Sequence, residues 1–197
     1  MNFPRILKKR KGYIDRIKPF MQKSVAKVLT GQRRVGKSFL LYQLIEEILA
    51  EEPDANIIYI NLEDFAFSFL QTAEDLHSYI ISHSKEKAKN YIFIDEIQDI
   101  PGFEKVIRSL LLNEDNDIYI TGSNAKMLSG ELATYLSGRY IEFKIYSLSY
   151  SEFLGFHGLT ESETSYELYS RYGGLPYLLN LPLEDETVNE YLKSVYS

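Results

Sequence analysis

The sequence of 197 residues contains no cysteine. This absence excludes a disulfide framework and any zinc or iron–sulfur site that cysteine thiolates would hold. It suits a reducing compartment, and we expect a cytoplasmic protein. The longest apolar run, residues 56–62, is far below the roughly 18 residues that suggest a membrane span, so we expect no membrane partner. Because no apolar stretch follows the basic N-terminus, we also expect no secretory signal.

Two further signatures are missing. The three histidines, His77, His83 and His157, do not have the spacing of metal ligands, so we interpret them as structural or surface residues. No G-x-S-x-G string occurs, which argues against a serine hydrolase.

Positive charge is concentrated at the start of the chain. The first 40 residues hold 12 lysines and arginines and one acid, Asp15, whereas the remainder holds 10 basic and 27 acidic residues. The densest block is residues 8–11. One interpretation is a contact for nucleic acid. The favoured interpretation is a solvated helix face, since runs of charge usually only solvate, and the acidic remainder would repel a duplex.

Strand and helix patterns alternate along most of the chain. We expect strands at residues 24–30, 56–61, 91–94, 117–120 and 140–145, and helices at residues 38–51, 72–85 (with Thr72 as N-cap), 103–112 and 125–136. Such alternation predicts an α/β fold: a five-stranded, mainly parallel sheet with helices on both faces.

The pattern changes after Leu148. Residues 150–156, 163–172 and 186–196 have helical patterns, and glycines and a proline at 173, 174 and 176 interrupt them. We therefore expect a basic helical lead-in at 1–17, a core at 18–147 and the start of a small helical lid at 148–197. The last helical pattern has no stop signal, which predicts that the chain continues in a longer protein.

Residues 31–38, GQRRVGKS, fit the phosphate-loop pattern G-x-x-x-x-G-K-[ST]. Backbone amides of such a loop wrap a β-phosphate, and the following helix presents its positive end to the anion. Lys37 would reach the β- and γ-phosphates, and Ser38 would supply a hydroxyl to Mg²⁺. The pattern predicts that ATP binds through the loop and the start of the helix: Gly31, Gln32, Arg33, Arg34, Val35, Gly36, Lys37, Ser38 and Phe39.

Two acids, Asp95 and Glu96, follow the apolar segment YIFI. Acids at the carboxyl edge of a parallel sheet lie in the crevice where such folds bind ligands. Asp95 is the candidate Mg²⁺ ligand, and Glu96 is the candidate base for an attacking water. The alternative is a strand that ends in solvated acids, and the upstream phosphate loop weighs against it.

The strand at 117–120 ends in the polar run TGSN. A side chain here can hold the nucleophilic water or sense a γ-phosphate. Ser123 and Asn124 are both candidates, and spacing does not choose between them. An ordinary turn with Asn124 as a helix cap is the alternative.

These elements, in this order, resemble the AAA-type ATPases of the additional-strand P-loop class. They are most similar to bacterial and archaeal ATP-binding proteins that join an AAA core to a C-terminal domain of unknown function. The resemblance rests on TGQRRVGKS (30–38), FIDEIQDI (93–100), ITGSNA (120–125), LSGRYIEFKIYSLSYSEF (136–153) and RYGGLP (171–176). Members of that group look about twice as long as this chain, so their C-terminal domain would be missing here.

The resemblance implies a three-layer P-loop fold and a role for individual residues. It implies Asp95 as the Walker B acid, Glu96 as the catalytic base and Ser123 as the sensor. Arg139, before the last strand, matches the place of an arginine that reaches the γ-phosphate of a neighbouring subunit, which would make the protein a homo-oligomer. The alternatives for Arg139 are a surface salt bridge or a helix C-terminal cation. Arg171 would be a second sensor.

We therefore expect an ATPase that uses Mg²⁺. Guanine-specific members of the P-loop class carry an N-K-x-D element, which this sequence lacks. A P-loop kinase is a weaker alternative, because Glu96 suits water rather than a substrate hydroxyl as the nucleophile. An ATP-gated switch or docking module with little turnover is the second alternative, and the sequence leaves it open.

Overall fold

The five expected strands form one parallel sheet. The computed structural model of the chain describes residues 8–123, 136 and 138–196. Its strands are β1 (Ala26–Gly31), β2 (Asn56–Asn61), β3 (Asn90–Asp95), β4 (Asn116–Ser123) and β5 (Tyr140–Lys144). Their spatial order is β2-β3-β4-β1-β5, and every neighbouring pair is parallel. The predicted sheet is confirmed, and the helix expected at 125–136 lies, except for Leu136, outside the described residues.

Burial follows the position of each strand in the sheet. Every residue of β1 and β3 is buried, and so is all of β4 except its last residue. The edge strands β2 and β5 are only partly buried. Central strands of a parallel sheet are covered on both faces, which is why their sequences are nearly continuous apolar runs.

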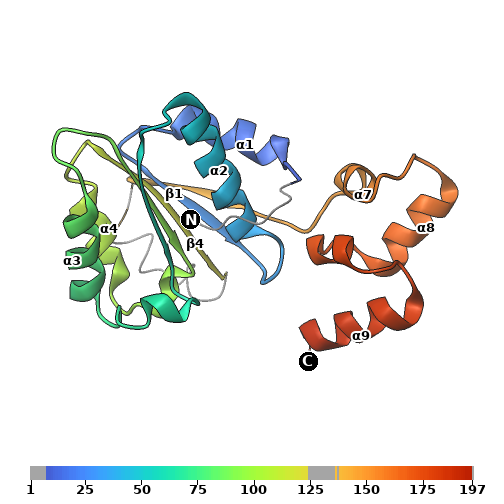
Figure 1. Ribbon diagram of the computed structural model, residues 1–197. Helices are drawn as coiled ribbons and strands as arrows, with labels where there is room; N and C mark the ends of the chain where they lie inside the picture. The colour runs from blue at the N-terminus through green and yellow to red at the C-terminus, as the bar shows by residue number, and fades with distance from the viewer. Residues whose placement is uncertain (1–7, 124–135, 137, 197) are drawn as a thin grey trace. The chain divides into compact units, whose positions relative to one another are not determined.

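Helices cover both faces of this sheet, which makes three layers (Figure 1). On one face lie α1 (Lys11–Ile17) and α2 (Lys37–Glu51), and on the other lie α3 (Ala73–His83) and α4 (Phe103–Leu110). Short 3-10 turns fill the connections: η1 (Lys18–Phe20), η2 (Phe65–Phe67) and η3 (Ile97–Asp99). The expected N-cap of α3 is confirmed, because the Thr72 side chain accepts from the Asp75 amide in a reciprocal capping box.

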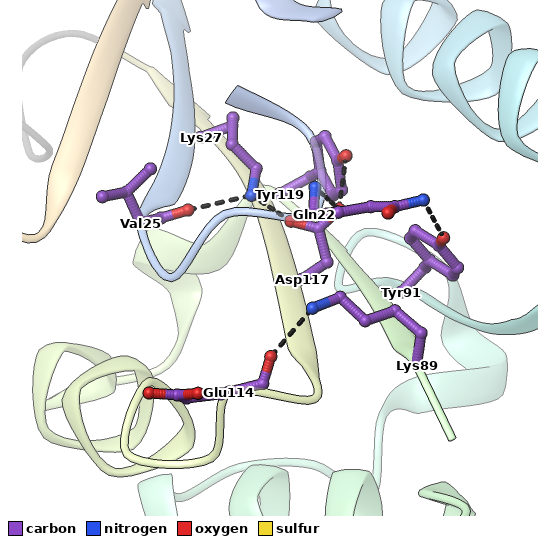
Figure 2. A network of polar contacts seen from close by, with 8 residues as sticks. All are labelled: Gln22, Val25, Lys27, Lys89, Tyr91, Glu114, Asp117 and Tyr119. Carbon is purple, nitrogen blue, oxygen red and sulfur yellow. Dashed lines mark hydrogen bonds and ion pairs between the residues drawn. The ribbon is translucent and has the colours of Figure 1, made fainter. Parts of the chain in front are cut away.

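An ion pair is buried at the amino edge of the sheet, where the strands begin (Figure 2). Lys27 of β1 pairs with Asp117 of β4, and both side chains are 0% exposed. The lysine also donates to the Val25 carbonyl at 2.9 Å, while the Gln22 amide and the Tyr119 hydroxyl each donate to Asp117 at 2.8 Å. Burial lowers the pKa of Lys27 and Asp117 opposes that shift. The full set of partners is what makes a buried pair tolerable.

The chain divides into two compact units. One holds residues 1–31 and 37–144, and the other holds residues 32–36 and 145–197. The second unit contains α7 (Tyr150–His157), α8 (Glu163–Tyr172), η4 (Pro176–Asn180) and α9 (Asp185–Tyr196). No helix in the described part of the chain has the length and apolar character needed to cross a membrane.

A glycine is required where the second unit folds back on itself. The Leu148 amide donates to the Gly174 carbonyl at 2.7 Å. A Cβ at position 174 would lie 2.2 Å from the Leu148 carbonyl oxygen, closer than real contacts allow. The Gly-Gly segment therefore serves close backbone packing, next to a small core of Tyr172, Leu175, Leu178 and Val188.

Candidate nucleotide site

Lys37 lies at the carboxyl edge of the sheet, where the strands end. It is the first residue of α2. Its Nζ donates to the Gly31 carbonyl at 3.3 Å and lies 3.6 Å from Glu96 Oε1, and the two side chains are 4% and 10% exposed. A close amine–carboxylate contact is about 2.7–2.9 Å, so this ion pair is loose. A carboxylate contact of this length is one that a phosphate oxygen could replace.

Asp95, the last residue of β3, is 2% exposed and surrounded by hydroxyl groups. The Thr121 hydroxyl donates to its Oδ1, and the Ser38 side chain also hydrogen-bonds the carboxylate. The Tyr59 hydroxyl lies 3.4 Å from Oδ2. Burial raises the pKa of Asp95, and the hydrogen bonds from Ser38 and Thr121 oppose that shift. A buried carboxylate held mainly by neutral groups favours the arrival of a cation.

Glu96 turns out of the strand directly after Asp95. Its backbone is left-handed, with φ 55° and ψ 47°, a conformation that L residues other than Asn and Asp rarely adopt. Its amide donates to Thr121 Oγ1 at 3.0 Å. Its carboxylate accepts from Gln98 Nε2 and faces Lys37. The left-handed turn therefore places the Glu96 carboxylate beside the lysine of the phosphate loop.

Ser123 ends β4 directly beside the start of the phosphate loop. The strand register pairs it with Gly31. This is the carboxyl edge that holds Lys37 and Asp95, and Ser123 stays a predicted sensor. Asn124, the other candidate, lies outside the described residues.

The phosphate loop has the backbone that an anion cradle needs. Arg34 has φ 66° and Gly36 has φ 94°, both left-handed, and such residues turn successive amides towards one side. Residues 32–36 are grouped with the C-terminal helices, and within that unit the Arg34 guanidinium lies 5.6 Å from the centre of the Tyr191 ring. Phe39, on the first turn of α2, is 46% exposed.

Sequence reasoning missed three residues of this site. Thr121 contacts both acids, Gln98 contacts Glu96, and Tyr59 contacts Asp95. Thr121 is the first residue of the polar run TGSN, and Gln98 comes two positions after Glu96. Both residues therefore lie in segments that the sequence analysis had already singled out. Tyr59 gave no signal, because an alternating tyrosine in an apolar strand is typical of packing.

The family comparison fits this geometry. The AAA domain family matches residues 23–154, which include the sheet, the phosphate loop and both acids. The chain belongs to the AAA domain family. This AAA domain is 39% identical over 196 residues to an uncharacterised protein of Haemophilus influenzae, and 31% identical over 185 residues to an uncharacterised protein of Methanocaldococcus jannaschii. The matches cover 94% and 86% of the chain but 47% and 40% of those proteins, so the chain spans about half the length of these relatives or less.

Solved structures share the fold of this AAA domain. Domain III of the replication initiation protein DnaA from Thermotoga maritima has a TM-score of 0.56 at 14% identity, covering 89% of this chain and 82% of that one. The ORC1 protein of Aeropyrum pernix, solved in complex with DNA, has a TM-score of 0.55 at 14% identity, covering 83% and 50%. At such identities the likeness extends to the fold alone, and it confirms the three-layer α/β fold expected from the sequence.

Arg139 of this AAA domain lies far from the acids of its own chain. It precedes β5, and its carbonyl accepts from the amide of Ala26, the first residue of β1, at 2.9 Å. This is the amino edge of the sheet, and the side chain is exposed. A strand of six residues spans about 17–20 Å, so Arg139 cannot serve the site of its own sheet. The predicted finger stays a prediction and requires a second subunit.

Arg171, the predicted second sensor, has partners on its own unit. Its guanidinium pairs with Asp185, and both side chains are about half exposed or more. The Tyr172 hydroxyl donates to the same carboxylate at 2.8 Å. These contacts connect α8 to the start of α9, and a sensor role for Arg171 stays a prediction.

Glu47 of α2 pairs with two lysines, one in the basic lead-in and one just after it. Lys9 and Lys18 both pair with Glu47, at 2.8 Å and 2.6 Å. Arg10 is 3% exposed, and its amide donates to the Gln43 side chain at 2.9 Å. These contacts attach the basic segment to α2, and whether its remaining charges bind nucleic acid stays a prediction.

Proposed function

We propose that this AAA domain binds ATP with Mg²⁺ and hydrolyses it. The observation that carries the proposal is the meeting of Lys37, Asp95 and Glu96 at one edge of the sheet, with the lysine ammonium 3.6 Å from the Glu96 carboxylate. Each group suits one part of phosphoryl transfer: a cation for phosphate, an acid for a metal and a base for water.

The lysine and the phosphate loop would bind the triphosphate. Lys37 Nζ exchanges its contact with Glu96 for the β- and γ-phosphate oxygens, which releases the glutamate. The loop amides and the positive end of α2 add favourable interactions with the anion. The binding of ATP and the release of Glu96 from Lys37 would then occur in one step.

Ser38 and Asp95 would hold Mg²⁺. Hydroxyl and carboxylate oxygens are ligands that this hard cation prefers, and the two side chains are already in hydrogen-bond contact. Among the residues that the structure describes, no three or more His, Asp or Glu side chains are grouped to hold a metal. A phosphate-bound Mg²⁺ needs only one or two protein oxygens beside phosphate and water, so the pair fits. The ion, when bound, neutralises charge on the phosphates.

Glu96, once released from Lys37, orients the attacking water and accepts its proton. Gln98 Nε2 stays within hydrogen-bond reach of the carboxylate and limits its rotation. Ser123, beside Gly31, is the candidate to contact the γ-phosphate. An adjacent base of this kind supports water, rather than a substrate hydroxyl, as the nucleophile.

One observation favours the second candidate, an ATP-gated switch with little turnover. The Glu96 carboxylate is held by both Lys37 and Gln98, so the base is engaged before any nucleotide binds. If ATP does not displace that lysine fully, the chain binds nucleotide without hydrolysing it. Arg139 from a second subunit is then the missing cation.

The test compares the wild-type chain with Glu96→Gln and Lys37→Ala. We expect wild type to bind ATP in a Mg²⁺-dependent manner, by calorimetry, and to release phosphate. Glu96→Gln should bind ATP at least as tightly, because a neutral amide competes less for Lys37, and should release no phosphate. Lys37→Ala should lose binding.

The matched control is Glu86→Gln, which removes an exposed glutamate away from the site and should change neither quantity. Equal binding by wild type and Glu96→Gln without turnover in either would favour the switch. Absence of Mg²⁺-dependent ATP binding in wild type would overturn the proposal.

A further inference from the structure

One hydroxyl group joins the two acids of the candidate site. Thr121 Oγ1 donates to Asp95 Oδ1 and accepts from the Glu96 amide at 3.0 Å. A threonine hydroxyl has one proton and two lone pairs, so these contacts use its donor and one acceptor position. Thr121 is 0% exposed, and water does not compete for either bond.

The strand geometry explains why a side chain is needed here. β3 and β4 run in register up to Ile94 and Ile120. The regular ladder between these strands ends there, and two residues after Ile94 the chain turns left-handed at Glu96, with φ 55°. The amide of Glu96 then finds its acceptor in the Thr121 side chain. A buried amide without an acceptor would be unfavourable by about 1–3 kcal/mol.

We propose that Thr121 is a positioning residue that fixes the carboxylate of Asp95 and the backbone of Glu96 relative to each other. The proposal rests on the proposed ATPase function and deepens it: the metal-binding acid and the base are held as one unit by a group that contacts neither substrate nor water. Ser38 and Tyr59 also reach Asp95, whereas Thr121 hydrogen-bonds both the Asp95 carboxylate and the Glu96 amide. A sensor of the γ-phosphate would have a free hydroxyl, whereas this one is engaged.

The decisive variants are Thr121→Val, which keeps the shape and removes the hydroxyl, and Thr121→Ser, which keeps the hydroxyl. We expect Thr121→Val to lower kcat about 10–100-fold, because an error of about 1 Å in placing a catalytic group has an effect of that order. The dissociation constant of ATP should change less than about threefold, while the Mg²⁺ concentration for half-maximal ATP binding should rise. Thr121→Ser should restore all three towards wild type.

A second readout needs neither nucleotide nor metal. The Glu96 amide proton should exchange with solvent at least about tenfold faster in nucleotide-free Thr121→Val than in wild type, and Thr121→Ser should restore the slow exchange. Ile118→Val is the matched control on the same strand. It removes one buried methylene, with a loss of stability in the usual range, and should leave kcat and the Glu96 exchange unchanged.

Each outcome decides. The proposal would be overturned if Thr121→Val had the same kcat, Mg²⁺ dependence and Glu96 amide exchange rate as wild type. It would also be overturned if Thr121→Ser folded but were as impaired as Thr121→Val. If Thr121→Val does not fold, Thr121→Ala replaces it, since alanine and serine differ by the same oxygen. If wild type binds ATP with Mg²⁺ but releases no phosphate, the proposed hydrolysis is wrong, while the Mg²⁺ dependence and the exchange rate still decide the role of Thr121.

Discussion

A lysine–carboxylate pair lies at each end of the parallel strands, one where they begin and one where they end. The two pairs differ in the distance between their charged groups and in their burial. At the amino edge, Lys27 and Asp117 are in close contact and 0% exposed. At the carboxyl edge, Lys37 and Glu96 are 3.6 Å apart and remain 4% and 10% exposed. The first pair has further partners of its own: the Val25 carbonyl for Lys27, and the Gln22 amide and Tyr119 hydroxyl for Asp117. The second pair keeps a loose contact that a ligand can replace.

The contrast shows that burial alone does not identify a functional charge. Lys27 is the more deeply buried lysine and its pKa is lowered, yet Val25, Asp117 and the Tyr119 ring occupy its surroundings. What distinguishes Lys37 is its long contact with Glu96, at 3.6 Å, beside a second acid, Asp95. We expect substitutions at the amino edge to change stability and substitutions at the carboxyl edge to change ligand binding.

The largest effect should follow from Asp117→Asn. This change leaves the ammonium of Lys27 buried without a countercharge, which destabilises a fold by about 3–5 kcal/mol. Urea unfolding monitored by circular dichroism measures it. The double variant Lys27→Met/Asp117→Asn should recover more than half of the loss, because methionine needs no countercharge. A loss below about 1 kcal/mol in the single variant would contradict the structural role.

An intermediate effect should follow from Lys37→Ala, and it should be on the affinity for ATP rather than on stability. The free energy of unfolding should fall less than in Asp117→Asn, because the ion pair that is removed is longer and the Glu96 carboxylate keeps its hydrogen bond from Gln98. The affinity for ATP should fall at least tenfold, since a hydrogen bond to a charged group contributes about 1.5–3 kcal/mol. A large loss of stability with unchanged affinity would remove the distinction between the two edges.

The smallest effect should follow from Glu47→Gln, at the surface pair with Lys9 and Lys18. Hydrogen bonds from these lysines lower the pKa of Glu47 from its ordinary 4.5 to about 2. A depressed native pKa stabilises the fold above the ordinary pKa, and this contribution disappears as the pH falls from about 4.5 to about 2. The lysines are 55% and 42% exposed, so we expect a loss of only about 0.2–1 kcal/mol at pH 7.

The pH dependence supplies the check. The difference in unfolding free energy between wild type and Glu47→Gln should shrink as the pH approaches 2, and should also shrink in high salt, which screens exposed charges. A difference that is constant with pH would mean that the carboxylate charge plays no part.

The sequence predicted the parts of this molecule that local patterns encode. Apolar runs located the strands, and the phosphate-loop spacing located Lys37 and Ser38. It did not predict the roles of Lys27 and Thr121, because these depend on which strands are neighbours. Lys27 meets Asp117 only because β1 lies beside β4, and Thr121 reaches Asp95 only because β4 also lies beside β3. The spacing of residues along the chain does not indicate which strands are neighbours in the sheet.

The first helix shows the same limit. The basic block at residues 8–11, which runs into this helix, is conspicuous in the sequence, and it suggested a solvated face. Ile14 and Ile17 are nevertheless buried. A helix with three charged residues in seven can still contribute to packing when two apolar residues three positions apart face its neighbour.

The left-handed backbone at Glu96 has a practical consequence for engineering. An L residue in this conformation is strained by about 1–2 kcal/mol, whereas glycine adopts it freely, although glycine also gives the unfolded chain more freedom. A thermostability screen would therefore tolerate glycine at position 96. A selection that rewards only folded protein has no reason to keep this carboxylate. If Glu96 is the base that we propose, libraries built that way will accumulate stable chains without hydrolysis unless position 96 is held constant.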